Sequence, residues 1–312
     1  MTKLAQRNYY GKALAKLAEE NPNVVVLDAD LAGSTKTSEF RKVAPERFIE
    51  VGIAEQDMIG IAGGLAASGK TVFASTFAVF ATGRCWEQIR LAMAYPRLNV
   101  KVVSTHCGIS VGPDGASHQA LEDIAIMRAI PNMTVISPAD AYEAYAATLA
   151  IADFDGPVYM RLGRADMPVL FDEDVKFEIG KAKKLRSGSD VTLIGTGLMV
   201  SLCMDAAEML EKDGISAEVI NISTIKPLDI EAIYESVSKT GCVVTAEEHS
   251  VIGGLGSAVA EFLSENCPCP ITRVGTRDTF GESGDPDELF KKYGLTAEDI
   301  RAAAEISIKK KE

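Results

Sequence analysis

Residues 48–69, FIEVGIAEQDMIGIAGGLAASG, form the most informative segment of the chain. It places one carboxylate, Glu55, at the start of a Gly- and Ala-rich helix that we expect over residues 55–68. A buried acid on an apolar helix costs free energy unless it forms hydrogen bonds. Glu55 therefore has either a partner within the protein or a ligand nitrogen to bind. A plainer alternative is an acid that the helix dipole favours at a helix N-terminus.

Composition and charge narrow the class of protein. The chain has 312 residues, 47% hydrophobic and 24% charged, as expected for a globular protein with two domains. Its net charge of −12, without a long basic block, argues against nucleic-acid binding. No stretch approaches the ~18 unbroken apolar residues of a membrane span, and no signal peptide is visible. The six cysteines form no CxxC pair, so we expect free thiols and a cytoplasmic protein.

Short apolar runs alternate with helical periods along the first half of the chain. We expect strands at 23–30, 71–75, 100–105, 133–137 and 157–162, and helices at 55–68, 84–94, 118–129 and 139–154. Continuous Val and Ile runs between helices predict parallel strands that are covered on both faces. Right-handed connections between such strands give an open, doubly wound sheet.

The pattern weakens after the first series and then begins again. Pro168, three consecutive acids and Gly188 mark a linker, and a second series of strands starts at residues 190–195. The predicted fold class is therefore α/β, with two doubly wound, mostly parallel-sheet domains. We predict a first domain at 1–168, a linker at 169–188 and a second domain at 189–312.

Several polar side chains follow the predicted strands, at the position where open α/β sheets bind their ligands. They are Asp28, Asp30, His106, Arg161, Arg164, Glu247, Glu248 and His249. All three histidines of the chain lie in such loops, which favours a functional role for this edge. For the run 247–249 we expect a subunit contact or a helix cap, and for Arg161 a structural role.

The Gly-rich loop at residues 106–118, HCGISVGPDGASH, contains His106, Asp114 and His118. The spacing of these three side chains matches no familiar set of metal ligands, so we predict no metal site in this chain. Neither GxxxxGKS nor GxGxxG occurs, so a known phosphate-binding loop is not indicated. The remaining interpretation is a substrate-binding loop whose two imidazoles donate hydrogen bonds or carry protons.

Four blocks of the sequence, in this order, resemble a known family. They are VGIAEQDMIGIAGGLAASG, STFAVF, STHCGISVGPDGASHQALEDIAIMRAIPN and TAEEHSVIGGLGSAV. Together they resemble the C-terminal half of a thiamine-diphosphate-dependent transketolase, over nearly the whole chain. The resemblance implies a pyrimidine-binding domain followed by a transketolase C-terminal domain.

The resemblance assigns cofactor contacts to five residues. Glu55 matches the catalytic glutamate that hydrogen-bonds N1′ of the cofactor's aminopyrimidine, and Phe77 and Phe80 match the aromatic pocket around that ring. Leu31 matches the apolar residue under the bent cofactor, and Asp30 lies in the same turn. Gly83 departs from the family pattern, because an aromatic residue often completes the pyrimidine pocket there. A partner side chain or Trp86 would then have to fill that space.

The resemblance also assigns substrate contacts. His118, a second catalytic candidate, and Asp114 match residues that contact the sugar hydroxyls near the reacting carbon. Ser34, His106 and Arg164 match the group that holds the substrate phosphate. A guanidinium suits this task because its planar fork binds phosphate oxygens in pairs.

The implied chemistry gives Glu55 a role. Thiamine diphosphate acts as an ylid once its thiazolium C2 loses a proton. Glu55 would share a proton with N1′ and stabilise the imino tautomer whose nitrogen removes that proton, a role that desolvation of the acid supports. The ylid would cleave a ketose phosphate, such as xylulose 5-phosphate or sedoheptulose 7-phosphate. The two-carbon glycolaldehyde unit would pass to ribose 5-phosphate or glyceraldehyde 3-phosphate, in the non-oxidative pentose phosphate pathway.

The chain lacks the other half of such an active site. The family's diphosphate- and metal-binding domain carries Gly-Asp-Gly followed later by Asn, and this motif is absent from the sequence. The resemblance therefore implies a split transketolase in which an N-terminal subunit binds the diphosphate and Mg²⁺ (or Ca²⁺). We expect an α2β2 heterotetramer with active sites at subunit interfaces, and an isolated chain without activity.

Other members of the wider group remain as alternatives. A 1-deoxy-D-xylulose-5-phosphate synthase shares VGIAEQ-like and DGxxH-like blocks, and a 2-oxoacid dehydrogenase β subunit has a similar length and architecture. A regulatory, non-catalytic transketolase-like subunit is a different class. A sulfonated sugar could replace the sugar phosphate, because the anion-binding residues would accept either group.

Overall fold

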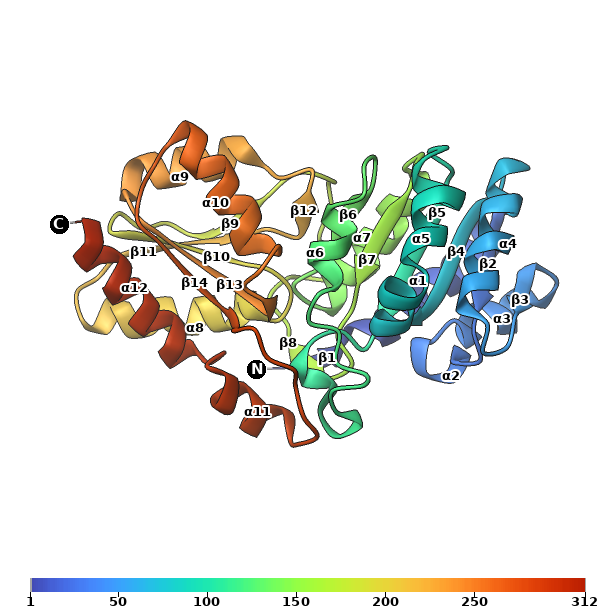
Figure 1. Cartoon of the computed structure of the whole chain (residues 1–312), viewed down its shortest axis with the longest axis horizontal. Helices are drawn as coiled ribbons and strands as arrows, with labels where there is room; N and C mark the ends of the chain where they lie inside the picture. The colour runs from blue at the N-terminus through green and yellow to red at the C-terminus, as the bar shows by residue number, and fades with distance from the viewer. Residues whose placement is uncertain (1, 312) are drawn as a thin grey trace.

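The computed structural model describes residues 2–311 and contains two α/β halves that lie side by side (Figure 1). The first half is built on a seven-stranded sheet in the order β12-β6-β7-β5-β4-β2-β3. Every neighbouring pair in this sheet is parallel except β12 with β6. Its strands are β2 (Val24–Asp28), β3 (Phe48–Glu50), β4 (Thr71–Phe77), β5 (Val100–Thr105), β6 (Thr134–Ile136), β7 (Val158–Arg161) and β12 (Thr224–Lys226).

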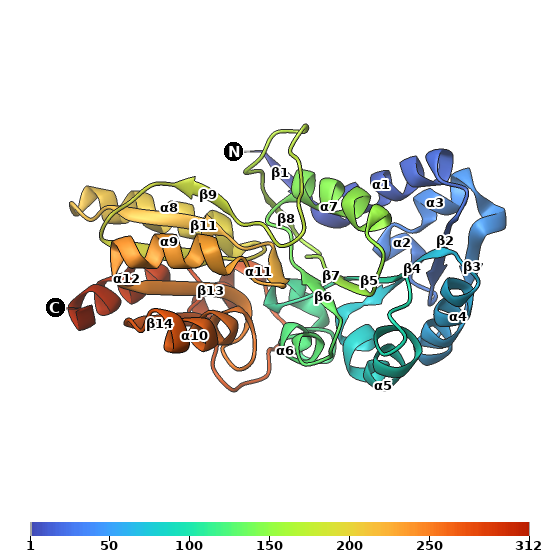
Figure 2. The same ribbon diagram turned by 90° about the horizontal axis from the view of Figure 1, so that it is seen from above.

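Helices cover both faces of the seven-stranded sheet (Figure 2). One layer is formed by α1 (Gln6–Glu20), α3 (Ser38–Val43) and α7 (Ala141–Asp153), and the other by α4 (Glu55–Ala67), α5 (Trp86–Ile89) and α6 (Asp123–Arg128). The central strands β2, β4, β5 and β7 are buried along their whole length. Burial on both faces explains why these strands are rich in apolar residues on both faces instead of alternating strictly between apolar and polar residues.

The second half repeats the design on a five-stranded sheet in the order β14-β13-β10-β11-β9. Its elements are β9 (Lys183–Arg186), β10 (Val191–Gly195), α8 (Met199–Lys212), β11 (Ala217–Asn221), α9 (Ile230–Thr240), β13 (Val243–Ser250), α10 (Leu255–Asn266), β14 (Ile271–Thr276), α11 (Pro286–Tyr293) and α12 (Ala297–Lys311). Only β9 runs antiparallel to its neighbour in this sheet. The predicted fold class, two mostly parallel α/β units, is therefore confirmed. No helix within residues 2–311 is both long and apolar enough to span a bilayer.

Three strands that the sequence did not predict change the picture of the linker and of the sheet edges, and one of them, β12, joins the two halves. β12 comes from the second half of the chain but pairs with β6 at the edge of the first sheet. β9 lies inside the stretch 169–188 that we expected to be a linker, and it pairs with β11. β1 (Lys3–Ala5) pairs with β8 (Asp166–Pro168), which ties the beginning of the described chain to the end of the first half.

Two expected helices differ from the structure. Only Asp123–Arg128 of the expected helix 118–129 is helical, because the residues before it close a loop instead: the Gly108 N–H donates to the Ala120 carbonyl at 3.0 Å. The expected helix 84–94 is a short α-turn flanked by the π-helical turns Phe80–Arg84 and Arg90–Ala94. Such π-turns occur frequently at functional sites.

Candidate active site

Parallel pairing brings most of the predicted site residues to one edge of the first sheet. The segments that follow β2, β3, β4, β5 and β7 all leave the sheet at its carboxyl end. They carry Asp30, Leu31, Ser34, Glu55, Phe77, Phe80, His106, Asp114, His118 and Arg164. The sheet topology therefore unites side chains that are far apart in the sequence.

Glu55 is the first residue of α4 and is only 2% exposed. Its Oε2 accepts a hydrogen bond from Nη1 of Arg84 at 2.6 Å, and Arg84 is itself half-exposed. No other hydrogen bond to the Glu55 carboxylate occurs within residues 2–311. An open pocket of ≈ 570 Å³ lies over this pair and is lined by Ile53, Glu55, Arg84 and their neighbours. Protein therefore covers one side of the Glu55 carboxylate. On the other side, the flexible side chain of Arg84 lies between the carboxylate and the open pocket.

A cluster of rings lies beside this pair. The Phe77 ring stacks on the His106 ring at 3.8 Å and on the Phe80 ring at 6.0 Å, measured between centroids. The His118 ring meets the edge of both phenylalanines, at 6.1 Å from Phe77 and 5.3 Å from Phe80. The guanidinium of Arg84 lies 4.9 Å from the Phe80 centroid, which connects the ring cluster to Glu55. The site is therefore walled by flat aromatic surfaces with polar groups at its margin.

A buried acid organises the turn after β2. Asp28 accepts hydrogen bonds from the Leu31 N–H at 2.6 Å and from the hydroxyls of Thr35 at 2.7 Å and Thr37 at 2.8 Å. Burial raises the pKa of Asp28 to about 6, although these hydrogen bonds oppose the shift. The network holds Asp30 in a left-handed conformation with φ of 61°, so that the turn presents Asp30 and Leu31 at the sheet edge.

His106 is buried among cationic neighbours. It follows β5 with a positive φ of 59°, and its Nδ1 lies 2.8 Å from the Thr105 hydroxyl. Burial, together with the positive charges of Arg7 and Arg164, lowers the pKa of His106 to about 3. The imidazole is therefore neutral at physiological pH and acts as a hydrogen-bonding group rather than a cation.

Arg7 joins this group from α1, and sequence reasoning missed it. Its Nη1 donates to the Ser34 carbonyl at 3.1 Å, while its Nε is buried and has no hydrogen-bond partner among the described residues. Burial, and then the nearby charge of Arg164, lowers the pKa of Arg7. The site thus combines two guanidiniums with a serine and a neutral imidazole. An anion bound among them would reduce the repulsion between Arg7 and Arg164 and would accept a hydrogen bond from Arg7 Nε.

The loop between His106 and His118 is fastened to the second half of the chain. Glu248 Oε1 accepts from the Ser110 N–H at 2.6 Å, and a Cβ at Gly108 would lie 2.3 Å from the Glu248 carboxyl. Gly108 also has a φ of 76°, so only glycine suits this position. Asp114 ends the turn Ile109–Asp114 and is exposed. The loop is held at its base by the second half while its tip remains accessible.

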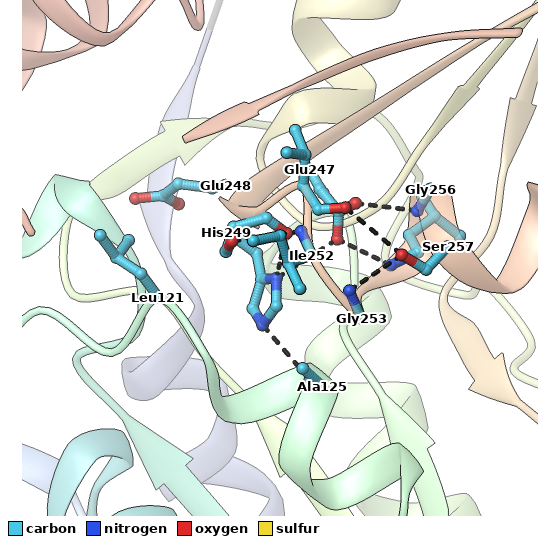
Figure 3. Close-up of polar contacts among 12 residues, drawn as sticks. Leu121, Ala125, Glu247, Glu248, His249, Ile252, Gly253, Gly256 and Ser257 are labelled. Atoms are coloured by element: carbon cyan, nitrogen blue, oxygen red, sulfur yellow. Dashed lines mark hydrogen bonds and ion pairs between the residues drawn. The ribbon is translucent and has the colours of Figure 1, made fainter. Parts of the chain in front are cut away.

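The run 247–249 serves structure, as we expected. Glu247 accepts from the N–H groups of Leu255 at 2.7 Å and Gly256 at 2.8 Å, and so caps α10 (Figure 3). His249 Nε2 lies 3.3 Å from the Ala125 N–H, which makes this nitrogen an acceptor. Its Nδ1 is 2.6 Å from its neighbour's carbonyl, so Nδ1 carries the proton. These polar groups fasten α6 to the second sheet.

Arg161 is also structural, which separates it from Arg164. Its Nε donates to Asp123 Oδ2 at 2.7 Å, both side chains are buried, and the Tyr159 hydroxyl donates to the same oxygen at 2.6 Å. Burial raises the pKa of Asp123, but the charge of Arg161 together with His249 and the hydrogen bonds from Tyr159 and Arg161 holds it below its usual value. Arg164 lies closer to the surface, and its Nη1 donates to the Val111 carbonyl at 3.4 Å.

The expectation that Trp86 fills the space beside Gly83 is wrong. The Trp86 indole N–H donates to the Ile126 carbonyl at 3.0 Å, and the ring packs against the core. Nothing lies within 4 Å of a Cβ built on Gly83, so this side of the site stays open apart from Arg84. Within residues 2–311, no cluster of three or more His, Cys, Asp and Glu side chains is arranged to hold a metal ion.

Comparison with known proteins agrees with this architecture. The family model "Transketolase, pyrimidine binding domain" matches residues 2–169, and "Transketolase, C-terminal domain" matches residues 180–300. A putative transketolase C-terminal section of Methanocaldococcus jannaschii is 53% identical over 94% of this chain and 93% of its own length. A 6-deoxy-6-sulfo-D-fructose transketolase subunit of Clostridium sp. is 48% identical over 97% of this chain and 95% of its own length.

A solved structure described as "Split gene transketolase, inactive beta4 tetramer" superposes closely. It has a TM-score of 0.93 and 53% identity, and the match covers 99% of this chain and 100% of the other. The matched sequence, the two-sheet architecture and the acid, rings and cations at the sheet edge lead to one conclusion. This chain belongs to the transketolase family, a family of thiamine-diphosphate-dependent transferases, and comprises its pyrimidine-binding and C-terminal domains as in the C-terminal section of a split transketolase.

Proposed function

We propose that the chain is the C-terminal subunit of a heteromeric transketolase that transfers a two-carbon unit from a ketose phosphate to an aldose phosphate. The observation that carries the proposal is the placement of Glu55 beside the Phe77 and Phe80 rings, next to the cationic group around Arg7 and Arg164. A buried acid beside flat rings suits an aminopyrimidine, and a cationic pocket suits a sugar phosphate.

The residues of this chain fit the pyrimidine half of thiamine diphosphate. Glu55 has a carboxylate whose Oε1 is free of hydrogen bonds within residues 2–311, and it would accept from N1′ of the ring. Phe77 and Phe80 would pack against the ring faces, with Leu31 and Asp30 in the neighbouring turn. When bound, thiamine diphosphate supplies the nucleophilic carbon for cleavage of a C–C bond. Glu55 would hold a proton at N1′, and its low exposure keeps water from competing for that contact.

The substrate would lie between the histidines and the cations. His118 and Asp114 would contact the sugar hydroxyls near the reacting carbon, and His118 would move protons there. At the far end, Ser34, His106 and Arg164, with Arg7 added by the structure, would bind the phosphate. The neutral state of His106 lets its ring accept or donate a hydrogen bond without adding a third charge to this group.

A partner subunit completes the proposed enzyme. An N-terminal subunit with the GDG…N motif would bind Mg²⁺ (or Ca²⁺) and the diphosphate, since oxygen-rich sites and phosphates suit these ions. We propose an α2β2 heterotetramer in the pentose phosphate pathway, with sugar phosphates as substrates. All six cysteines are free, which supports a reducing, cytoplasmic location.

Reconstitution tests the proposal. The chain and an N-terminal transketolase subunit that carries the GDG…N motif are purified separately and assayed with thiamine diphosphate, Mg²⁺, xylulose 5-phosphate and ribose 5-phosphate. We expect turnover from the mixture and none from either subunit alone. Turnover by the isolated chain would contradict the split enzyme. Preference for pyruvate as donor would instead favour a deoxyxylulose-phosphate synthase or a 2-oxoacid dehydrogenase β subunit.

A sulfo-sugar transketolase is the second candidate. The similarity to a relative named for 6-deoxy-6-sulfo-D-fructose favours it, and guanidiniums bind sulfonate as well as phosphate. The two substrates differ in charge, because a phosphomonoester carries about −1.5 to −2 at neutral pH and a sulfonate carries one negative charge. Ratios of kcat/KM for sulfofructose and fructose 6-phosphate decide between them.

A further inference from the structure

We propose that Arg84 forms the wall of the pyrimidine pocket that Gly83 leaves open, and that it positions the Glu55 carboxylate for the cofactor. This inference rests on the proposed function and assigns a cofactor-binding role to a residue that the family pattern did not indicate. It replaces the expectation that Trp86 fills this space.

Contact with Glu55 is the first observation. Arg84 Nη1 donates to Glu55 Oε2 at 2.6 Å, and this is the carboxylate's one hydrogen bond within residues 2–311. The contact with Arg84 occupies Oε2 alone and leaves the second oxygen of the carboxylate available. Oε1 is thus left to accept a ligand N–H while Oε2 is held. Arg84 therefore acts on the cofactor partly through Glu55.

Contact with the ring cluster is the second observation. The Arg84 guanidinium lies 4.9 Å from the centroid of Phe80, one of the two phenylalanines assigned to the pyrimidine pocket. A guanidinium is planar and only weakly hydrated, so it stacks on aromatic rings as an aromatic side chain does. Its second face can then meet the ring of a ligand. A lysine could supply the charge but not the flat surface.

The backbone places Arg84 for this role. It ends the π-helical turn Phe80–Arg84, and its carbonyl accepts from Gln56 Nε2 at 3.1 Å, which ties it to the first turn of α4. Nothing lies within 4 Å of a Cβ at Gly83, and Trp86 is turned into the core. Arg84 lines the open pocket at Glu55 together with Ile53, Gln56 and Asp57, and its 47% exposure leaves it accessible to a ligand.

Cofactor binding by the reconstituted complex tests the inference. Isothermal titration with thiamine diphosphate and Mg²⁺ is compared for wild type, Arg84→Met, Arg84→Lys and Arg90→Met. Met keeps the length of the side chain without charge or plane, and Arg90 is an exposed arginine on the next π-turn that serves as the matched control. We expect Arg84→Met to weaken binding about 10-fold or more, Arg84→Lys to restore only part of it, and Arg90→Met to match wild type.

A cofactor analogue separates the two parts of the role. In an analogue whose pyrimidine N1′ is replaced by carbon, the contact with Glu55 is lost and only stacking remains. We expect Arg84→Met to weaken binding of this analogue less than binding of thiamine diphosphate. Equal losses would overturn positioning through Glu55. A tighter complex with Arg84→Met would mean that Arg84 obstructs the pocket, and would overturn the inference.

Failure of the inference is distinguishable from failure of the proposed function. If the wild-type complex does not bind thiamine diphosphate, both are overturned. If the wild type binds and Arg84→Met binds equally well, only the role of Arg84 is overturned. Thermal unfolding of each isolated variant and gel filtration of each complex verify folding and assembly, so that a loss of binding is assigned to the pocket.

Discussion

Glu55 and Glu247 are both buried carboxylates beside the first turn of a helix, one in each half of the molecule. Glu247 accepts two backbone N–H groups of α10, from Leu255 and Gly256. Glu55 is bonded only to the side chain of Arg84, within the described residues. Hydrogen bonds from rigid backbone N–H groups thus offset the free-energy cost of burying Glu247. For Glu55 the same cost is offset only by the hydrogen bond from a half-exposed arginine.

Burial alone therefore does not identify a functional acid. Glu247 lies inside β13 and Glu55 begins α4, but neither position by itself marks a ligand-binding acid. What separates them is the kind of partner. Backbone donors engage both oxygens of Glu247, whereas Oε1 of Glu55 has no hydrogen bond within residues 2–311 and its one partner is a movable side chain. Four experiments test this contrast between the two acids.

Glu55→Gln should have the largest effect on activity. The amide keeps the shape and can still bond to Arg84, but it cannot hold a proton for a ligand nitrogen. We expect kcat of the reconstituted enzyme to fall by about 10²–10⁴-fold, with the unfolding free energy of the isolated chain changed by less than ~1 kcal/mol. If activity survives within about tenfold, or ~1.4 kcal/mol, Glu55 is not the cofactor acid.

Glu247→Gln should show the opposite behaviour. Weakening two hydrogen bonds from backbone N–H groups to a buried carboxylate should lower the free energy of unfolding by ~2–3 kcal/mol, measured by urea denaturation. Cofactor affinity of the folded complex should be unchanged. Glu265→Gln, on the exposed end of the same helix, is the control and should stay within ~0.5 kcal/mol of wild type. A stable Glu247→Gln variant that loses cofactor binding would reverse the comparison.

Arg7→Gln and Arg164→Gln test the cationic group around His106. Each removes a charge-assisted contact worth ~1.5–3 kcal/mol, so KM for a sugar phosphate should rise roughly 10- to 150-fold with little change in kcat. An unphosphorylated sugar should show almost no difference between the variants and wild type. Lys16→Gln, on an exposed part of α1, is the matched control. Equal KM values for all variants would place the anion elsewhere.

The substitution His106→Asn tests how the free energy of unfolding depends on pH. We expect its effect to be the smallest of the four. The folded-state pKa of about 3 lies below the ordinary 6.5, so the unfolded chain binds the proton first on acidification. His106 therefore lowers the free energy of unfolding as the pH falls below 6.5, by about 2 kcal/mol at pH 5. Asp28, with a raised pKa of about 6, contributes in the opposite direction. The difference between wild type and variant in urea titrations isolates His106; parallel curves would contradict its buried neutral state.

Much of the fold followed from the sequence because its central strands are buried on both faces. Valine-rich runs such as those of β2 and β5 are short, lie between helical periods and end in polar residues, which is typical of buried parallel strands. β3 and β12 were missed because each has three residues and lies at a sheet edge. Local sequence carries little information on a strand whose partner lies far away along the chain.

Candidate site residues that lie within continuous sequence motifs could be predicted. Residues that reach the site singly from a helix could not. Glu55, the phenylalanines and both loop histidines fall within the matched blocks, and the structure brings them to one edge. Arg7 was missed because an arginine on an amphipathic helix is usually solvated. Arg84 was missed because only the structure reveals its π-turn and its contact with Phe80.

β12 has a consequence for dividing this protein. It is a three-residue strand supplied by the second half, and it covers β6, which would otherwise be the open edge of the first sheet. A first domain that ended at the linker would lack β12, and the backbone N–H and C=O groups of β6 would be left unpaired. An exposed strand edge of this kind pairs readily with other chains and promotes aggregation. The two domains therefore cannot be separated at the linker without removing a strand from the first sheet. A chimera with a different second domain must also supply an edge strand that matches β6.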